Sequence, residues 1–237
     1  MHLCQCTLKY RRISLKLSGE AMGGAEPIDF QAVESVAREI QALSLAGVEV
    51  GITIGGGNMW RGRSSGNMDR NRADQMGMLA TAVNSLAMEA ALKELGVPVK
   101  VFSSIPMETV CESFTAERAD EAMKAGQVTI FACGSGRPFF STDTAAALKA
   151  AEIGAQALFL AKNVDAVYSA DPHKDPCAVR YTRISYDEVI QKGLQATDLT
   201  AITLCREQGI PIVVFALKEK GAILRAARGE ETGTLID

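Results

Sequence analysis

Six short apolar runs, separated by helical patterns, recur along the whole chain and constrain its fold more than any other feature of the sequence. Each run has 4–7 residues. Several are rich in Val and Ile, as the buried strands of parallel sheets tend to be. We predict strands at residues 12–17, 48–54, 99–102, 128–132, 157–160 and 212–215.

Helical periodicity fills the segments between these strands. Residues 30–45 follow Asp29, a suitable N-cap, and place one apolar face at Phe30, Val33, Val36, Ala37, Ile40 and Leu43. Residues 76–95 place a second apolar face at Leu79, Val83, Leu86 and Ala90. Ser185 and Glu188 have the spacing of a capping box and predict the start of another helix.

The alternation of strands and helices predicts an α/β protein, a three-layer αβα sandwich with a central, mainly parallel sheet. No internal repeat or linker divides the chain. We therefore expect a single domain over residues 11–237, preceded by a frayed N-terminal tail at residues 1–10. With 237 residues, 47% of them apolar, the chain has enough material for one core.

Charge and composition argue against several classes of protein. The chain has 25 Lys and Arg against 28 Asp and Glu, a balance that disfavours nucleic-acid binding and a polybasic membrane anchor. The longest uncharged stretch, residues 75–88, is too short and too polar for a transmembrane helix. The six cysteines form no Cys-x-x-Cys pair and His2 and His173 lie far apart, so no zinc site is expected. We expect a reduced cytoplasmic protein.

Three predicted strands are followed by loops that are rich in glycine. These loops span residues 16–24, 55–63 and 134–143, and their basic side chains are Lys16, Arg61, Arg63 and Arg137. Glycine lets an anion approach the backbone N–H groups closely, and a helix N-terminus behind the loop adds a partial positive charge. Ligands of parallel sheets bind outside the carboxyl ends of the strands. The three loops together therefore indicate phosphate binding.

The standard nucleotide motifs do not fit these loops. The chain contains no Gly-x-x-x-x-Gly-Lys-Ser/Thr sequence, which excludes a P-loop. A dinucleotide fingerprint would need a third glycine where Trp60 and Phe139 stand. The sequence therefore excludes a P-loop protein and disfavours a dinucleotide-binding Rossmann fold.

Five motifs in order resemble the amino acid kinase superfamily and, within it, the bacterial uridylate (UMP) kinases. They are Lys16-Leu17-Ser18-Gly19-Glu20-Ala21, Gly55-Gly56-Gly57-Asn58 with Arg61-Gly62, Asp74-Gln75-Met76-Gly77-Met78-Leu79-Ala80-Thr81, Pro138-Phe139-Phe140-Ser141-Thr142-Asp143, and Asn163-Val164-Asp165 through Tyr168-Ser169-Ala170-Asp171-Pro172. The resemblance runs from about Arg11 to the C-terminus, where Gly233-Thr234-Leu235-Ile236 also looks like the family's ending.

The resemblance implies an enzyme of pyrimidine nucleotide biosynthesis that transfers the γ-phosphoryl group of Mg-ATP to UMP, giving UDP and ADP. It implies a UMP-binding N-terminal part, an ATP-binding C-terminal part, and a homohexamer with GTP and UTP as possible effectors. By the family pattern, ATP contacts fall at Lys16, Leu17, Ser18, Gly19, Gly57, Arg61, Lys162, Asn163, Tyr168 and Asp171. UMP contacts fall at Gly56, Asp74, Ser135, Gly136, Arg137, Pro138, Phe139, Phe140, Ser141 and Thr142. The catalytic candidates are Lys16, Arg61, Asp143 and Asp198, and no residue is assigned as a metal ligand.

The chain departs from the family pattern at several positions. Arg137 stands where the family commonly has Asn, and Ala166 replaces a usual Gly. The usual Gly-Phe-Gly stretch is missing, since residues 24–27 read Gly-Ala-Glu-Pro. Positions on the helix ending near Leu95 that often carry basic residues for the family's effector site read Glu89, Ala90 and Lys93, so activation by GTP is not carried over.

The chemistry of a phosphate acceptor agrees with this resemblance. A phosphate monoester has a second pKa near 6 and is mostly dianionic at pH 7, so no general base is needed.

The alternative functions are acetylglutamate or carbamate kinase activity on the same fold, a non-catalytic nucleotide- or oxyanion-binding protein, and an NAD-dependent oxidoreductase. For Asp74 we expect hydrogen bonds to the ribose hydroxyls, with a helix N-cap as its alternative role.

Overall fold

The computed structural model describes residues 7–61, 66–172, 174–194 and 197–237, and its centre is a nine-stranded sheet. The sheet contains β1 (Arg12–Leu17), β2 (Glu49–Ile54), β3 (Val99–Ser103), β4 (Glu112–Ser113), β5 (Val128–Ala132), β6 (Ala157–Lys162), β9 (Arg183–Ile184), β10 (Ile212–Ala216) and β11 (Thr234–Ile236). Their order is β4-β3-β5-β2-β1-β6-β10-β11-β9, and only β10 and β11 pair in antiparallel fashion within it. The predicted strands are confirmed, with bounds that differ by at most two residues.

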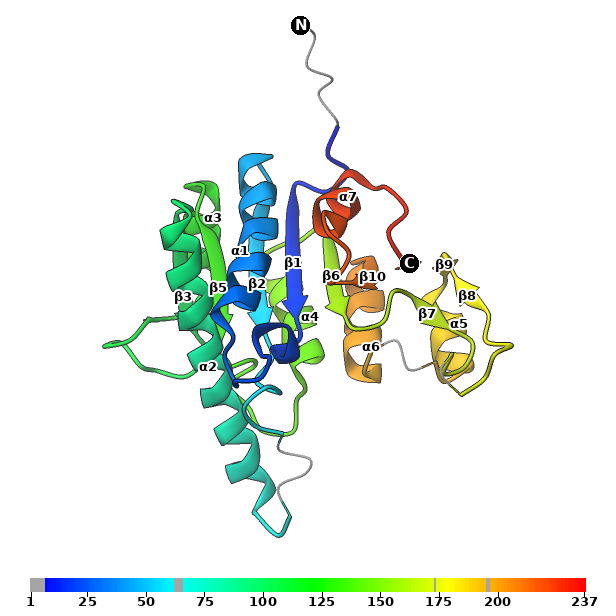
Figure 1. The fold of residues 1–237 in the computed structure, drawn as a ribbon, viewed down its shortest axis with the longest axis horizontal. Coiled ribbons are helices and arrows are strands. Elements are labelled where there is room, and N and C mark those ends of the chain that lie inside the picture. Colours follow the sequence, from blue (N-terminus) through cyan, green and yellow to red (C-terminus); the bar gives the residue numbers. More distant parts are fainter. Residues whose placement is uncertain (1–6, 62–65, 173, 195–196) are drawn as a thin grey trace, which may run out of the picture.

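Helices cover both faces of this sheet (Figure 1). The helical segments are η1 (Gly19–Met22), α1 (Phe30–Leu45), α2 (Arg70–Glu94), α3 (Ala116–Lys124), α4 (Thr142–Glu152), α5 (Tyr186–Gln191), α6 (Leu199–Gln208) and α7 (Ala222–Arg228). Helices α1, α2 and α7 pack on one face, and α3 to α6 pack on the other. A small hairpin of β7 (Val167–Tyr168) and β8 (Arg180–Tyr181) lies beyond β6, near α5 (Figure 1). The predicted αβα sandwich is thus confirmed.

The alternation of side chains along each strand divides the core into two layers. On β1, Ile13, Leu15 and Leu17 are fully buried beneath α1, α2 and α7. On the opposite face, the hydroxyl group of Ser14 donates a hydrogen bond of 3.1 Å to the carbonyl oxygen of Ala146 in α4. A Cβ atom on Gly51 would lie 2.7 Å from the ring of Phe131. Small residues on the two central strands therefore let α4 pack close to the sheet.

Helix α1 matches its prediction at both ends. The carboxylate of Asp29 accepts hydrogen bonds from the N–H groups of Gln31 and Ala32, as an N-cap should. The predicted apolar face is buried except at Phe30, which is 73% exposed. Phe30 is the first helical residue and points away from the core, so its assignment to the buried face was wrong.

Helix α2 differs from its prediction in both start and orientation. It begins at Arg70, with Asp69 as its N-cap, rather than at residue 76. Leu79 and Val83, predicted to be buried, are 54% and 45% exposed. The buried face instead carries mainly small or polar residues and methionines: Ala73, Met78, Ala80, Thr81, Ala82, Asn84, Ser85, Met88 and Leu92. Close packing against a glycine loop selects this face, as described below.

The N-terminal tail predicted at residues 1–10 is too long, because Lys9 and Tyr10 belong to the folded domain. The N–H groups of Lys9 and Tyr10 both donate hydrogen bonds of 3.0 Å to the carbonyl oxygen of Ala227. Tyr10 is buried, and its ring packs edge-on against Phe159 in the core. Ordered structure therefore begins before residue 11, while residues 1–6 lie outside the described part of the chain.

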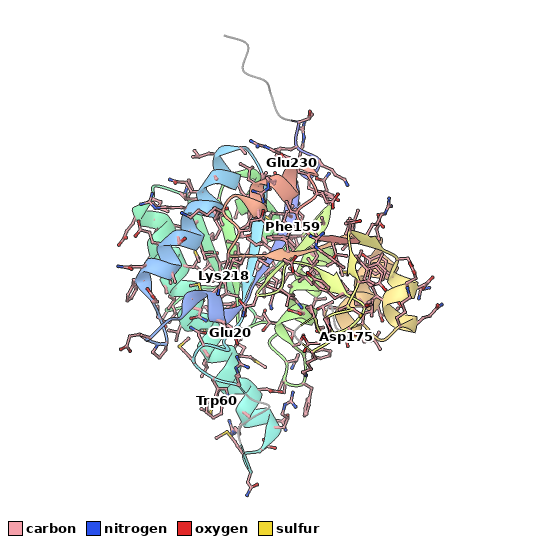
Figure 2. All side chains as sticks on the ribbon, turned by 45° about the vertical axis from the view of Figure 1, so that its right-hand side comes forward. Glu20, Trp60, Phe159, Asp175, Lys218 and Glu230 are labelled. Atoms are coloured by element: carbon pink, nitrogen blue, oxygen red, sulfur yellow. The ribbon has the colours of Figure 1, made fainter. Side chains whose placement is uncertain are left out.

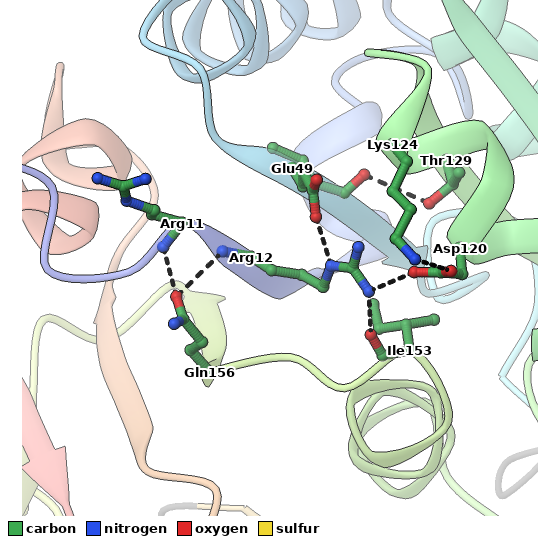
Figure 3. A network of polar contacts seen from close by, with 9 residues as sticks. Arg11, Arg12, Glu49, Asp120, Lys124, Thr129, Ile153 and Gln156 are labelled. Atoms are coloured by element: carbon green, nitrogen blue, oxygen red, sulfur yellow. Dashed lines mark hydrogen bonds and ion pairs between the residues drawn. The ribbon is translucent and has the colours of Figure 1, made fainter.

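A polar network fastens the amino end of the central strand (Figure 3). The guanidinium group of Arg12 donates hydrogen bonds to Glu49 on β2, to Asp120 on α3 at 2.8 Å, and to the carbonyl oxygen of Ile153 at 2.8 Å. Arg12 thereby joins β1 and β2 to helices α3 and α4, on one face of the sheet, at the end of β1 opposite Leu17. Among the residues described, no helix is long and apolar enough to cross a membrane.

Candidate functional site

The three glycine-rich loops meet at one end of the sheet. They follow β5, β2 and β1, which are adjacent in the sheet and run parallel, so their carboxyl ends lie side by side. Between the loops lies a cavity of about 930 Å³. Figure 2 shows Glu20 and Trp60 at this end of the molecule, while Phe159 lies at mid-sheet and Glu230 at the opposite end. Ligand binding at the carboxyl ends of the strands was predicted, and a cavity of nucleotide size occupies that position.

Most of the predicted site residues line this cavity. They are Lys16, Ser18, Gly19, Gly56, Gly57, Arg61, Asp74, Ser135, Arg137, Phe139, Phe140, Ser141, Thr142, Asp143, Lys162 and Asp198. Leu17, Gly136, Pro138, Asn163, Tyr168 and Asp171 do not belong to the lining. Gly62 and Arg63, which the sequence also placed in these loops, fall outside the described residues.

A carboxylate between two lysines forms part of the lining of the cavity. Asp143, in the first turn of α4, places one carboxylate oxygen 2.8 Å from Nζ of Lys16 and the other 2.9 Å from Nζ of Lys162. The hydroxyl group of Thr197 donates a further hydrogen bond of 2.7 Å to Asp143. The two lysines come from the ends of β1 and β6, which are neighbours in the sheet. The cluster thus brings together four separate segments of the chain: β1, the start of α4, the end of β6 and the residue before Asp198.

The protonation state of Asp143 follows from these contacts. Burial by itself would raise the pKa of this carboxyl group, because a charge loses its hydration in the interior. The ammonium groups of Lys16 and Lys162 outweigh this effect and hold the pKa far below its usual range. Asp143 is therefore ionised at neutral pH, and it fixes two positively charged groups at the floor of the cavity.

Asp198 connects α6 to the loop that follows β5. Its carboxylate caps α6 by accepting a hydrogen bond of 2.9 Å from the N–H group of Ala201. The same carboxylate accepts hydrogen bonds from the hydroxyl groups of Ser141 and of Thr144, the latter at 2.7 Å. Ser141 in turn caps α4. The contacts of Asp198 therefore hold the start of α4 in place.

Asp74 lies one turn inside α2, so the alternative role as an N-cap was wrong. Its Oδ2 atom accepts one hydrogen bond of 2.8 Å from Nε of Arg70 and another of 2.8 Å from the N–H group of Phe139. Phe139 has a φ of 74°, and Cys133 in the same loop has a φ of 63°. Non-glycine residues rarely adopt such values, and they cluster at functional sites. Asp74 therefore helps to hold a strained loop at the cavity.

The loop after β2 depends on glycine because it approaches α2 closely. A Cβ atom on Gly56 would lie 2.9 Å from both Cβ of Ala80 and the carbonyl oxygen of Gly77. Asn84, fully buried on α2, donates a hydrogen bond of 2.7 Å to the carbonyl oxygen of Gly55. This contact explains why α2 turns its small and polar face toward the sheet.

The first loop approaches the second just as closely. A Cβ atom on Gly19 would lie 2.5 Å from the carbonyl oxygen of Gly55 and 2.7 Å from the N–H nitrogen of Gly57. Only hydrogen fits at that position. The two loops therefore form one continuous backbone surface along the cavity.

Arg61 reaches the cavity from the loop after β2 and forms an ion pair with Glu20 of η1. The other carboxylate oxygen of Glu20 accepts a hydrogen bond of 2.7 Å from the side-chain amide of Asn163, which follows β6. Tyr168 lies farther out, where its hydroxyl group donates to Asp165 at 3.0 Å. Asn163 therefore lies at the rim of the cavity, whereas Tyr168 belongs to β7 and Asp171 lies in the connection from β7 to β8.

Sequence reasoning missed several residues that support the site. Glu20, Asn84 and Thr197 were given no role, although each contacts a predicted site residue or loop. Thr81 was also missed, and its hydroxyl oxygen accepts a hydrogen bond of 2.9 Å from the N–H group of Cys133. The polar residues Thr81, Asn84 and Ser85, in an otherwise apolar stretch of α2, were the signal that could have revealed this packing.

Residues 11–216 match the sequence model of the amino acid kinase family. The chain is similar to the crystal structure of UMP kinase from Ureaplasma parvum, with 36% identity, a TM-score of 0.92, and coverage of 97% of this chain and 100% of that one. UMP kinase from Bacillus anthracis shows 35% identity, a TM-score of 0.93 and 96% coverage of both chains. Uridylate kinase from Archaeoglobus fulgidus shows 26% identity and a TM-score of 0.73, with coverage of 96% of this chain and 100% of that one.

Proposed function

The chain belongs to the amino acid kinase family, and on this premise we propose that it is a UMP kinase, which transfers the γ-phosphoryl group of Mg-ATP to UMP and releases UDP and ADP. The resemblance inferred from five motifs is thereby confirmed at the level of the family. The assignment to UMP rests on similarity over nearly the full length to two UMP kinases at 35–36% identity.

One observation carries this proposal: the pairing of Lys16 and Lys162 with one carboxylate, in a cavity bounded by three glycine-rich loops. Transfer between two polyanions is opposed by charge repulsion, about 4 kcal/mol for unit charges ~4 Å apart at an effective dielectric constant near 20. Fixed positive charges and backbone N–H groups offset this repulsion without reorganising during the reaction. The cavity supplies both kinds of group.

The acceptor needs no general base in this scheme. The phosphate of UMP is mostly dianionic at pH 7, and its attacking oxygen carries no proton that must be removed. Asp143 therefore has a positioning role, because it holds the ammonium groups of Lys16 and Lys162. Lys16 and Arg61 are the groups proposed to contact the transferring phosphoryl.

Magnesium enters this proposal as part of the substrate Mg-ATP. In kinases Mg²⁺ is usually held by one or two carboxylates together with substrate phosphates, and it neutralises part of their charge. The cavity lining contains Asp143 and Asp198, whose carboxylate oxygens are donors of the kind that Mg²⁺ prefers. The residues present therefore fit a metal that is bound mainly by the nucleotide.

The two nucleotides are proposed to bind at different loops of the cavity. We propose that ATP binds beside Lys16, Gly57, Arg61 and the segment after β6, and that UMP binds beside Asp74 and the loop after β5. Residues 11–237 would then act as one domain, with the UMP half nearer the N-terminus and the ATP half nearer the C-terminus. The loops after β2 and β5 follow adjacent strands and line the same cavity, which supports this end-to-end arrangement.

We also propose that the protein forms a homohexamer in the cytoplasm, with GTP and UTP as possible effectors. The apolar side chains of Leu79 and Val83 are exposed on α2 and support contact with a second subunit. Size-exclusion chromatography with light scattering would test the hexamer directly. A monomer at micromolar concentration would contradict it.

The activity itself is tested by measuring ADP release from Mg-ATP with UMP, CMP, dTMP, carbamate and acetylglutamate in parallel. We expect UMP to give the highest kcat/KM. Faster turnover of carbamate or acetylglutamate would assign the chain to another branch of the family. Nucleotide binding measured by calorimetry without any turnover would identify a non-catalytic nucleotide-binding protein instead.

A further inference from the structure

A single carboxylate ties together three loops at the mouth of the cavity. Glu20 lies in η1, directly after β1, and lines the cavity. One of its oxygens pairs with the guanidinium group of Arg61, and the other accepts a hydrogen bond of 2.7 Å from the amide of Asn163. Both partners are residues proposed above to contact ATP. Glu20 therefore binds the same two side chains that are proposed to bind ATP.

The other carboxylates of the cavity are held differently. Asp74 and Asp198 accept hydrogen bonds from backbone N–H groups, and Asp143 is only 14% exposed between its two lysines. The side chains of Glu20 and Arg61 are 40% and 62% exposed. Ion pairs that face solvent contribute little to stability, because water and salt screen them. The contact between Glu20 and Arg61 is therefore one that an incoming anion can displace.

Carboxylate and phosphate present similar oxygen atoms to a guanidinium group. Among the described residues, the cavity is lined by five cationic and four carboxylate side chains, so its positive excess is small. A ligand that carries several phosphate charges thus meets a site in which the carboxylate of Glu20 is already paired with one of the cations.

We propose that Glu20 acts as an internal competitor of the ATP phosphates. In the free protein its carboxylate holds Arg61 and Asn163 at the rim of the cavity. When ATP binds, both side chains exchange the carboxylate of Glu20 for phosphate oxygens. Glu20 therefore lowers the affinity for ATP and positions two residues that later contact it. The inference rests on the proposed binding of ATP at this site.

The test replaces the carboxylate by an amide of the same shape, in Glu20→Gln. We expect the affinity for Mg-ATP, measured by calorimetry on the full-length protein, to rise about 2- to 5-fold, the scale of an exposed ion pair. Tripolyphosphate should show the same gain, because the competition concerns phosphate groups alone. Glu26→Gln is the matched control: it removes an equal charge from an exposed position in the same segment and should leave both affinities unchanged.

A second pair of variants separates exchange of partners from simple charge repulsion. If Glu20 competes for Arg61, then adding Glu20→Gln to Arg61→Ala should restore little of the lost affinity. An equal gain in the Arg61→Ala background would overturn the proposal in favour of general repulsion. Weaker ATP binding by Glu20→Gln, or by Glu20→Ala should the first variant fold poorly, would overturn it in favour of a purely structural role.

Kinetics supply a readout that a structural role would not give. The KM for ATP should fall in Glu20→Gln while the KM for UMP stays constant. The calorimetric titrations contain no UMP, so they succeed or fail independently of the proposed reaction. Binding of ATP with the expected gain, but without turnover of UMP, would leave this inference intact and refute the function.

Discussion

Replacing Asp143 by Asn should lower the free energy of unfolding by an amount that follows from the ion pairs of this side chain. The change keeps the shape of the side chain and removes the charge that Lys16 and Lys162 share. Both lysine side chains are largely buried, at 11% and 19% exposure, so neither can easily turn to solvent. The variant therefore leaves two ammonium groups facing one neutral amide.

The magnitude follows from the distances. Two ammonium groups that bind the two oxygens of one carboxylate lie roughly 5 Å apart, and at an effective dielectric constant near 20 they repel by about 3 kcal/mol. Removing one partner from a buried ion pair typically costs about 3–5 kcal/mol. Because the cluster is partly open to the cavity, we expect Asp143→Asn to lower the free energy of unfolding by about 3 kcal/mol at pH 7.

The same cluster gives the expected pH dependence. The pKa of Asp143 is lowered in the folded protein relative to its ordinary value of 3.8. A lowered pKa means that the stabilisation is fully present above that ordinary value and is lost as the pH falls through the folded-state pKa. The difference in stability between wild type and Asp143→Asn should thus be constant near neutrality and shrink below about pH 4.

Urea denaturation at one fixed protein concentration, followed by circular dichroism between pH 3 and pH 8, would measure both effects. Asp187→Asn is the control, because the pair of Asp187 with Arg206 is exposed and should contribute less than about 1 kcal/mol. A loss below 1 kcal/mol for Asp143→Asn, or a loss that does not shrink in acid, would refute the assigned charge pairing.

Three further substitutions test other parts of the molecule. Lys16→Ala should lower kcat by about 10²-fold or more in the ADP-release assay, because a transition-state contact is lost. Lys124→Ala, at an exposed site, is the control and should leave kcat unchanged. Equal rates for the two variants would contradict the role of Lys16. Gly19→Ala should destabilise the protein by about 1–3 kcal/mol in thermal unfolding, because its Cβ would lie 2.5 Å from a carbonyl oxygen. Gly77→Ala, whose nearest neighbour is 3.8 Å away, should be neutral or stabilising, so a greater loss there than at Gly19 would be inconsistent with this packing. Asp29→Ala should reduce the free energy of unfolding by about 1 kcal/mol through loss of the N-cap, and an unchanged urea midpoint would argue against the cap.

The sequence predicted secondary structure best where local signals and tertiary packing agree. Helix α1 has an N-cap at Asp29 and an apolar face that meets the sheet, so both its start and its orientation were predictable. In α2 the two signals conflict. Its apolar residues Leu79 and Val83 are exposed, because Asn84 and the small residues near Gly77 must face the glycine loop. Periodicity alone could not reveal that requirement.

The site shows the same division. The meeting of three loops was predictable, because parallel strands bring their carboxyl ends to one edge of the sheet. Its supporting contacts were not, because they join residues far apart in the chain. Thr197 lies 54 positions from Asp143, and Glu20 lies 143 positions from Asn163. Nothing in the neighbouring sequence of either residue indicates its partner.

The central position of β1 has a consequence for the order in which the protein can be assembled during translation. β1 is the first strand to leave the ribosome, and one of its edges can pair with β2 soon afterwards. Its other edge can pair only after β6 has been synthesised. That edge keeps unpaired N–H and C=O groups until Ala157 has been synthesised, and such edges invite pairing with other chains. Lys162 and Thr197 arrive later still. Nascent chains that stall before β6 should therefore depend on chaperones, and the lysine cluster should form only near the end of synthesis.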